Sequence, residues 1–247
     1  MIIVTNKDAT KLNPTTIAIT ATFTALTFVA TYFLQISLPI SGGYFNLGEV
    51  VIYITALAFG PWIGAFAGGI GSMLADIASP YAVWAPGTLV IKGLEGLVVG
   101  LLYARLKRGK SSLEPAKPKD IVSLLIFGFL SSASIIIFGV AFFADGLVVW
   151  IILAILMLVA IMLAVYYIKV NMYWITFSVL AGMLIMVPGY LIYGFFLKGA
   201  EALTEVPVNI IQCLVGMYLA IPVYQSLYKS KILENFVIQK KAQETAS

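Results

Sequence analysis

The sequence predicts an all-α integral membrane protein of about eight transmembrane helices, forming one domain over residues 1–247 with both termini in the cytoplasm. Of the 247 residues, 61% are hydrophobic and only 11% are charged, whereas soluble domains carry roughly 25% charged residues. The mean hydropathy is +1.02. Uncharged apolar stretches of about 20 residues, the length that spans a bilayer core, recur along the chain. These observations together place the chain in a cell membrane.

The predicted helices follow these stretches in order. Two of them, 47–59 and 62–77, are short for a perpendicular span, and the breaker pair Gly60-Pro61 separates them. The stretch 88–104 contains two charged residues but is long enough to span, and the hydrophilic segment 105–120 follows it as a loop. The full set of predicted helices is 14–36, 47–59, 62–77, 88–104, 121–143, 147–168, 174–196 and 206–228.

The distribution of basic residues predicts the orientation. Cytoplasmic loops of membrane proteins are enriched in lysine and arginine. With residue 1 in the cytoplasm, thirteen of the fifteen basic residues fall in cytoplasmic segments, Lys198 falls outside, and Lys92 lies within a helix. The formal net charge of +4 therefore reflects membrane topology and does not indicate a nucleic-acid partner.

Two ionisable residues lie within the predicted helix 88–104. Lys92 and Glu95 are spaced i and i+3, so they share one face of the helix and can pair with each other. Ionisable groups inside a span are costly and indicate a functional site by default. One interpretation is a structural ion pair that only fixes packing; the other is a ligand site, because Gly93 and Gly96 would let a ligand approach the backbone closely.

Further polar and aromatic side chains gather at the predicted outer ends of the helices. They come from the turn-rich segment 41–49, from the loop 79–86, and from the start of the last helix, where Asn209 and Gln212 face the same way. Aromatic walls with a few convergent hydrogen-bonding groups are typical of a small-molecule site. The predicted substrate-binding residues are Tyr44, Asn46, Glu49, Tyr81, Trp84, Lys92, Glu95, Asn209 and Gln212.

The composition argues against catalysis and against metal binding. The chain has no histidine and one cysteine, which removes most metal sites, disulfides and histidine-based triads. It also has no Walker motif, so any dependence on ATP requires separate subunits. We therefore predict no catalytic residue, no metal and no cofactor.

Several motifs resemble one membrane protein family. They are GYFNLGE at 43–49, FGPWIGA at 59–65, GGIGS at 68–72, TLVIKGLEG at 88–96 and EVPVNIIQ at 205–212. This pattern is similar to the substrate-binding S components of energy-coupling factor (ECF) vitamin transporters, especially the riboflavin-transporter type. The similarity covers about the first 105 residues and the last 60. Within the pattern, Glu49 stands where the family more often has aspartate.

The resemblance implies a function and partners. It implies capture of a water-soluble vitamin outside the cell, and work with a transmembrane T component and two cytoplasmic ATPase subunits. The family's T-component motif maps onto Ala21 and Ala25. S components usually have six helices, so 121–168 is interpreted as an insertion of two more.

The site residues suit a flat heterocycle, such as a flavin or a pyrimidine or pyridine vitamin, and leave open which one. The alternative function is a stand-alone secondary transporter that uses Glu49, Asp76 or Glu95 as a proton site.

Overall fold

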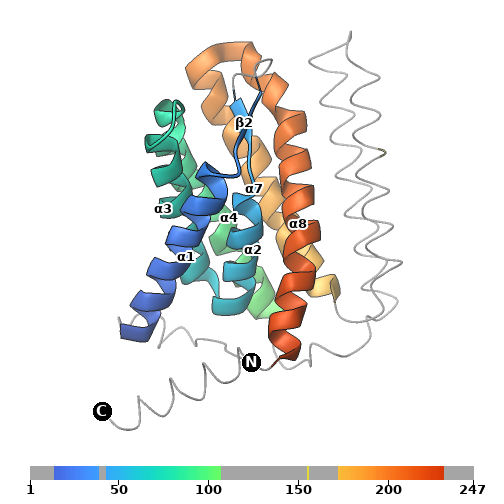
Figure 1. The fold of residues 1–247 in the computed structure, drawn as a ribbon. Coiled ribbons are helices and arrows are strands. Elements are labelled where there is room, and N and C mark those ends of the chain that lie inside the picture. The colour runs from blue at the N-terminus through green and yellow to red at the C-terminus, as the bar shows by residue number, and fades with distance from the viewer. Residues whose placement is uncertain (1–13, 39–42, 107–154, 156–171, 231–247) are drawn as a thin grey trace. The chain divides into compact units, whose positions relative to one another are not determined.

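A computed structural model describes residues 14–38, 43–106, 155 and 172–230 of the chain (Figure 1). The predicted helix 121–143, all of the predicted helix 147–168 except residue 155, almost all of the predicted loop and the two ends of the chain lie outside these residues. The chain divides into two compact units, Met1–Arg108 with Ser178–Ser247, and Gly109–Phe177. The description below concerns the first unit. The prediction of a single domain, and of eight helices with cytoplasmic termini, stays a prediction.

The first helix is shorter than predicted. Helix α1 spans Pro14–Tyr32, and the chain then forms a two-stranded antiparallel hairpin from β1 (Ile36–Leu38) and β2 (Gly43–Phe45), with Ser37 opposite Tyr44. The sequence prediction of helix to residue 36 is wrong here, whereas the mostly helical structure is consistent with the predicted all-α membrane protein. Apolar composition could not distinguish a continued helix from a short strand, because the strand pairing is made with residues further along the chain.

The next two helices are short, as predicted. Helix α2 spans Gly48–Phe59 and helix α3 spans Pro61–Ile77. Gly60 separates them with φ of 94°, a conformation that favours glycine, and Pro61 occupies the start of α3. Helix α2 contacts α1, α3, α4 and α8, and most of its side chains are buried. At about 1.5 Å per residue its twelve residues cover only part of a bilayer core of about 30 Å.

Helix α4 (Ala85–Leu106) packs closely on α3, after the 3-10 turn η1 (Ala82–Trp84). Its glycines permit this approach: a Cβ added to Gly96 would lie 2.6 Å from the carbonyl carbon of Gly64, and one added to Gly69 would lie 3.2 Å from the Cα of Gly93. Gly69 and Gly96 therefore serve packing between these helices. The interpretation that Gly93 and Gly96 admit a ligand to the backbone stays a prediction.

The last described elements are helix α7 (Met172–Lys198), the 3-10 helix η3 (Gly199–Glu205) and helix α8 (Val206–Lys229). The part of α7 in the first unit lies against α4, since a Cβ on Gly189 would contact the side chain of Ile91 at 3.0 Å. Figure 1 shows η3 and the hairpin at the same end of the bundle. Gly43 lies against the side chain of Glu205, which joins the hairpin to η3 directly.

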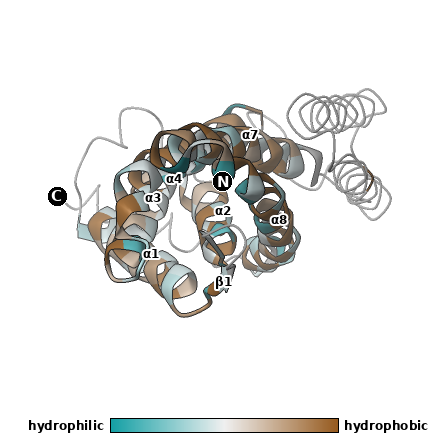
Figure 2. Ribbon diagram, turned by 90° about the horizontal axis from the view of Figure 1, so that it is seen from above, coloured by the Kyte–Doolittle hydropathy of each residue, from teal (hydrophilic) through white to brown (hydrophobic). Residues whose placement is uncertain are grey.

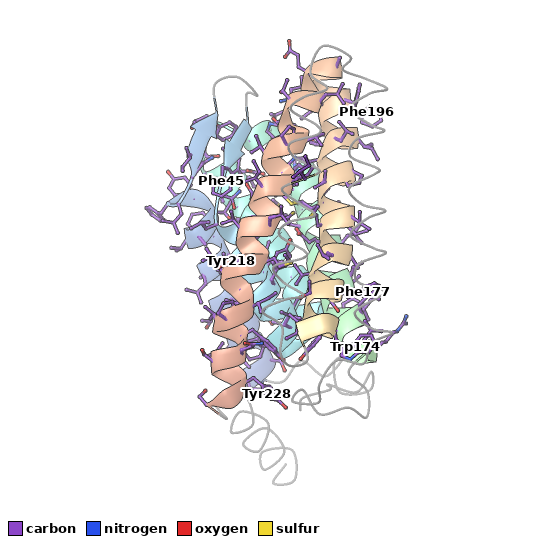
Figure 3. The ribbon with its side chains drawn as sticks, turned by 90° about the vertical axis from the view of Figure 1, so that its right-hand side faces the viewer. Phe45, Trp174, Phe177, Phe196, Tyr218 and Tyr228 are labelled. Atoms are coloured by element: carbon purple, nitrogen blue, oxygen red, sulfur yellow. The ribbon has the colours of Figure 1, made fainter. Side chains whose placement is uncertain are left out.

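The outward faces of these helices are apolar. Figure 2 shows hydrophobic residues over most of α7 and α8, and Figure 3 shows Phe196 and Tyr218 pointing away from them, with 84% and 79% of their surface exposed. Within the described residues, Pro14–Tyr32 and Trp174–Tyr228 are long and apolar enough to cross a membrane. Such exposed apolar surface is stable in lipid and a liability in water.

Candidate functional site

A buried ion cluster lies where α2 and α4 meet. The ammonium group of Lys92 forms ion pairs with Oε1 of Glu49 and, at 3.1 Å, with Oε2 of Glu95. All three side chains are almost completely shielded from solvent. The predicted i and i+3 pair therefore forms, and it gains a second carboxylate from α2. The geometry also explains why Lys92 can be buried, because each of its close partners carries the opposite charge.

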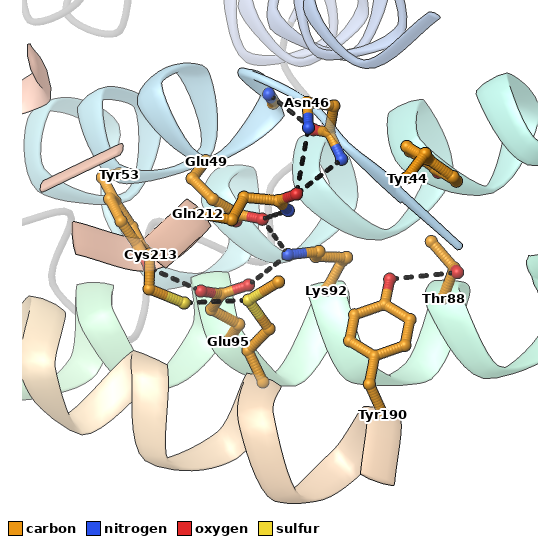
Figure 4. A network of polar contacts seen from close by, with 12 residues as sticks. Tyr44, Asn46, Glu49, Tyr53, Thr88, Lys92, Glu95, Tyr190, Gln212 and Cys213 are labelled. Carbon is orange, nitrogen blue, oxygen red and sulfur yellow. Dashed lines mark hydrogen bonds and ion pairs between the residues drawn. The ribbon is translucent and has the colours of Figure 1, made fainter. Parts of the chain in front are cut away.

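Amide and phenol groups extend this cluster to α8 and to the loop before α2 (Figure 4). The side-chain amide of Gln212 donates to Oε1 of Glu49 at 2.5 Å, and its Oε1 accepts from the backbone N–H and the side chain of Asn46 at 3.0 and 3.2 Å. Tyr53 donates to Oε1 of Glu95 at 2.7 Å. The network ties α2, α4 and α8 together, so it positions the side chains above it.

Above the network lies a small pocket beneath the hairpin. Its volume is about 30 Å³, which is room for about two water molecules. The lining side chains come from the hairpin and the residue after it, from α3, η1 and α4, and from α7, η3 and α8. They are Tyr44, Asn46, Asp76, Trp84, Thr88, Met186, Tyr190, Glu205, Asn209 and Gln212.

Aromatic rings form much of the wall. The rings of Tyr44 and Tyr81 lie 4.6 Å apart between centroids, and the hydroxyl of Tyr81 donates to the carbonyl of Gly43 at 3.4 Å. On the other side, Trp84 lies 6.2 Å from the ring of Tyr190, whose hydroxyl donates to Thr88 at 3.0 Å. Flat apolar faces with polar edges are suited to hold a heteroaromatic ring.

Two acidic side chains of the lining differ in their partners. Glu205 pairs with Lys198 at 2.5 Å, and this ammonium lies 5.2 Å above the ring of Trp84. Burial raises the pKa of Glu205 above its usual value, and Lys198 opposes that rise. Asp76 is completely buried and accepts a hydrogen bond from the hydroxyl of Tyr44. Burial, and next the charge of Asp76, raise the pKa of Tyr44 well above its usual value, so this phenol stays a donor.

The structure brings the predicted site residues together in two layers. Tyr44, Asn46, Trp84, Asn209 and Gln212 line the pocket. The ion network behind Gln212 contains Glu49, Lys92 and Glu95. The ring of Tyr81 packs against that of Tyr44. That these residues bind a substrate stays a prediction.

The prediction of the site omitted five lining residues: Asp76, Thr88, Met186, Tyr190 and Glu205. Asp76 and Glu205 are acidic residues at helix ends in an otherwise apolar chain, and this signal was available in the sequence. Tyr190 follows Pro188-Gly189 within a long apolar stretch, where nothing in the local pattern points toward α4. Met186 and Thr88 carry no signal that separates them from ordinary helix-packing residues.

Comparison with known proteins gives two matches. Residues 11–166 match the family model described as ECF-type riboflavin transporter, S component. A curated protein of Pyrococcus woesei, described as an uncharacterized protein in the gap 3′ region, is 51% identical over 72 residues, which is 29% of this chain. The match spans about half of that relative, 48% of its length.

Proposed function

Because the chain belongs to the family of ECF-type riboflavin transporter S components, and so is a substrate-binding membrane subunit and not an enzyme, we propose that it captures a water-soluble vitamin or related heterocycle at its hairpin end. The observation that supports this most is the pocket beneath the hairpin, where aromatic rings and hydrogen-bonding groups converge from elements far apart in the sequence. This is the make-up of a small-molecule site. We place this end outside the cell, because Arg105 lies at the opposite end of α4.

The pocket must enlarge to accept its substrate. A volume of about 30 Å³ is far below the roughly 300 Å³ or more of typical ligand sites. The hairpin is the covering element that can move at least cost, since Tyr44, Tyr81 and Asn46 hold it to the rest of the pocket by a few hydrogen bonds. We propose that capture begins with displacement of the hairpin and ends with its return over the bound molecule.

Thermal unfolding of the detergent-purified protein tests the proposal. The probes are riboflavin, a hydroxymethylpyrimidine, pyridoxine, biotin, pantothenate, niacin and thiamine. A ligand at one hundred times its dissociation constant adds about 2.7 kcal/mol of stability. We expect at least one selective stabiliser, whose effect falls in Gln212→Leu, a change within the pocket, and persists in Glu201→Gln, a change at an exposed residue of η3. A folded protein that none of the probes stabilises would contradict the proposal.

We also propose that α1 docks on a T component, which works with two ATPase subunits. Ala21 and Ala25 are exposed and line an apolar groove of about 860 Å³ between α1 and α3. Small side chains let two helices approach closely in lipid. Ala25→Trp should abolish co-purification with the T component and vitamin uptake while leaving vitamin binding intact. The matched control is Val90→Trp on the exposed face of α4.

Uptake that follows a proton gradient and survives removal of the ATPases would favour the secondary transporter.

A further inference from the structure

The carboxylates around the pocket differ in whether an ammonium group forms an ion pair with them. Glu49 forms an ion pair with Lys92, and Glu205 forms one with Lys198. Asp76 forms no ion pair with any residue that the structure describes, and the donor to its Oδ1 is the neutral hydroxyl of Tyr44. The pocket therefore contains one carboxylate whose negative charge has no partner of opposite sign in contact.

The second oxygen of Asp76 accepts no hydrogen bond within 3.5 Å from the described residues, although the hydroxyl of Thr88, itself an acceptor from Tyr190, is near enough to interact with the carboxylate. The side chain is completely shielded from solvent and lines the pocket. A buried carboxylate oxygen without a donor costs free energy that a bound donor would recover, and a charged donor would recover most. This atom is accordingly placed to accept a hydrogen bond from a molecule in the pocket.

The surrounding charges favour the same kind of molecule. Four described carboxylates lie in or next to the pocket and two ammonium groups oppose them, which leaves a formal excess of two negative charges. The carboxylates belong to Glu49, Asp76, Glu95 and Glu205, and the ammonium groups to Lys92 and Lys198. Because charge interactions are strong in a poorly solvated site, an anionic ligand is disfavoured there and a cationic one is favoured.

The aromatic wall already receives positive charge. The ammonium of Lys92 lies 5.5 Å from the centroid of the Tyr190 ring, and that of Lys198 lies 5.2 Å from the Trp84 ring. Aromatic faces attract cations at such distances. A flat ring that carries positive charge would meet the same attraction from the rings that line the pocket.

We infer that the substrate is a compact heteroaromatic molecule with a positive charge or a protonated amino group, which donates to Oδ2 of Asp76. This inference rests on the proposed function and narrows its substrate class. It favours ring compounds of the aminomethylpyridine or aminopyrimidine type over a neutral flavin and over carboxylate vitamins such as biotin.

Three pyridine compounds that share one ring and differ in charge test the inference. Pyridoxamine carries an ammonium group, pyridoxine carries a hydroxyl at the same position, and 4-pyridoxate carries a carboxylate. Dissociation constants are measured by titration calorimetry on the full chain in detergent, with thiamine as a larger cation and riboflavin as a larger neutral ring. We expect each cationic probe to bind more tightly than the neutral probe of similar size, and 4-pyridoxate to bind most weakly.

Substitution of Asp76 identifies the responsible group. Asp76→Asn should weaken the binding of the cationic probes by about 10- to 100-fold, the range of one charge-assisted hydrogen bond. The affinity for the neutral probes should change by less than about threefold. Glu201→Gln removes one negative charge from an exposed position of η3 and should change neither. If Asp76→Asn fails to fold, Tyr44→Phe provides the test: it removes the donor to Oδ1, so the preference for cations should persist or increase.

The outcomes separate this inference from the proposed function. Tight binding of riboflavin or pyridoxine without a preference for cations, or equal losses for all probes in Asp76→Asn, would overturn the inference and leave vitamin capture standing. A loss of cation preference in Tyr44→Phe would also overturn it. A folded protein that binds no probe would contradict both.

Discussion

Helix α4 makes two contacts, one with α3 and one with α2, that are built in opposite ways. Along α3 and α4, glycines bring the two backbones together, as at Gly64 with Gly96 and at Gly69 with Gly93. At the level of Lys92, α4 instead presents a charged side chain to α2, where Glu49 receives it. The first region is held by close packing of small residues, and the second by ion pairs and hydrogen bonds that reach α8 through Gln212.

The difference shows what each region requires of the chain. Close packing depends on glycines that lack a side chain at the contact between the two helices. The loss of stability should therefore increase with the volume of the side chain that replaces each glycine. The ion network depends on several charges being present together, so removal of one leaves the others buried without a partner. We therefore expect large, non-additive effects in the network and smaller, position-specific effects at the glycines.

The largest effect should come from Lys92→Met. It leaves Glu49 and Glu95 buried without their counter-charge, and a broken buried pair costs about 3–5 kcal/mol. Thermal unfolding in detergent measures the loss. Replacing both carboxylates by glutamine in the same chain should restore much of the stability. If the single and triple variants are equally destabilised, the network is not organised by charge.

At the glycine contact, Gly96→Ala should destabilise by about 1–3 kcal/mol, because the new methyl group would meet the carbonyl group of Gly64, which belongs to backbone and cannot move aside. The same thermal assay measures it, and neighbouring Gly64→Ala should give a similar loss, since its Cβ would lie 2.8 Å from the Cα of Ala56. Unchanged stability in both variants would show that α3 can move away from α4 and from α2, to which Ala56 belongs, without cost.

Gly93→Ala is the control for Gly96→Ala, because Gly93 lies on the same helix but has space for a methyl group. The nearest atoms to an added Cβ are the carbonyl oxygen of Ala65 at 3.6 Å and the Cα of Gly69 at 4.0 Å, which are ordinary contacts. Alanine is the better helix former by about 1 kcal/mol. We expect unchanged or slightly increased stability, and a loss as large as that of Gly96→Ala would contradict packing as the cause.

The smallest effect concerns pH at Glu205, outside the ion network. Burial raises the pKa of this carboxyl in the folded protein above its usual value of 4.5. The folded state therefore holds the proton more strongly than the unfolded state, and the stability this gives is lost as pH rises from 4.5 through the folded pKa. We expect the stability of the wild type relative to Glu205→Gln, measured by thermal unfolding, to fall as pH rises across this interval. If this stability difference rises with pH, the pKa of Glu205 in the folded protein is lowered and not raised.

Local pattern was sufficient for most helices of the described fold. The Gly60-Pro61 break, the short α2 and α3, and the long apolar α7 and α8 follow predicted bounds within a few residues. Helix α4 begins at Ala85, three residues before the prediction, because Pro86 is tolerated in a first turn. The strand at 36–38 was missed, because it is defined by its pairing with 43–45 and not by its own composition.

The candidate site was predictable only where polar residues stand out against an apolar background. Lys92, Glu95 and Gln212 could be recognised in this way, and the i and i+3 spacing of Lys92 and Glu95 was enough to predict their pairing. Tyr190 and Met186 could not, since aromatic and methionine side chains in an apolar helix are ordinary.

The sequence by itself determined that this is a helical membrane protein, the order of its described helices, and the end at which its polar groups gather, because hydropathy and charge act over one or two turns of chain. Only the tertiary structure decided that Glu49 joins Lys92, that Gln212 bridges to Asn46, and that Asp76 lines the pocket and accepts a hydrogen bond from Tyr44. The contacts Tyr44–Asp76, Glu49–Lys92 and Asn46–Gln212 join residues 32, 43 and 166 positions apart, so they depend on how the elements pack and not on any local pattern.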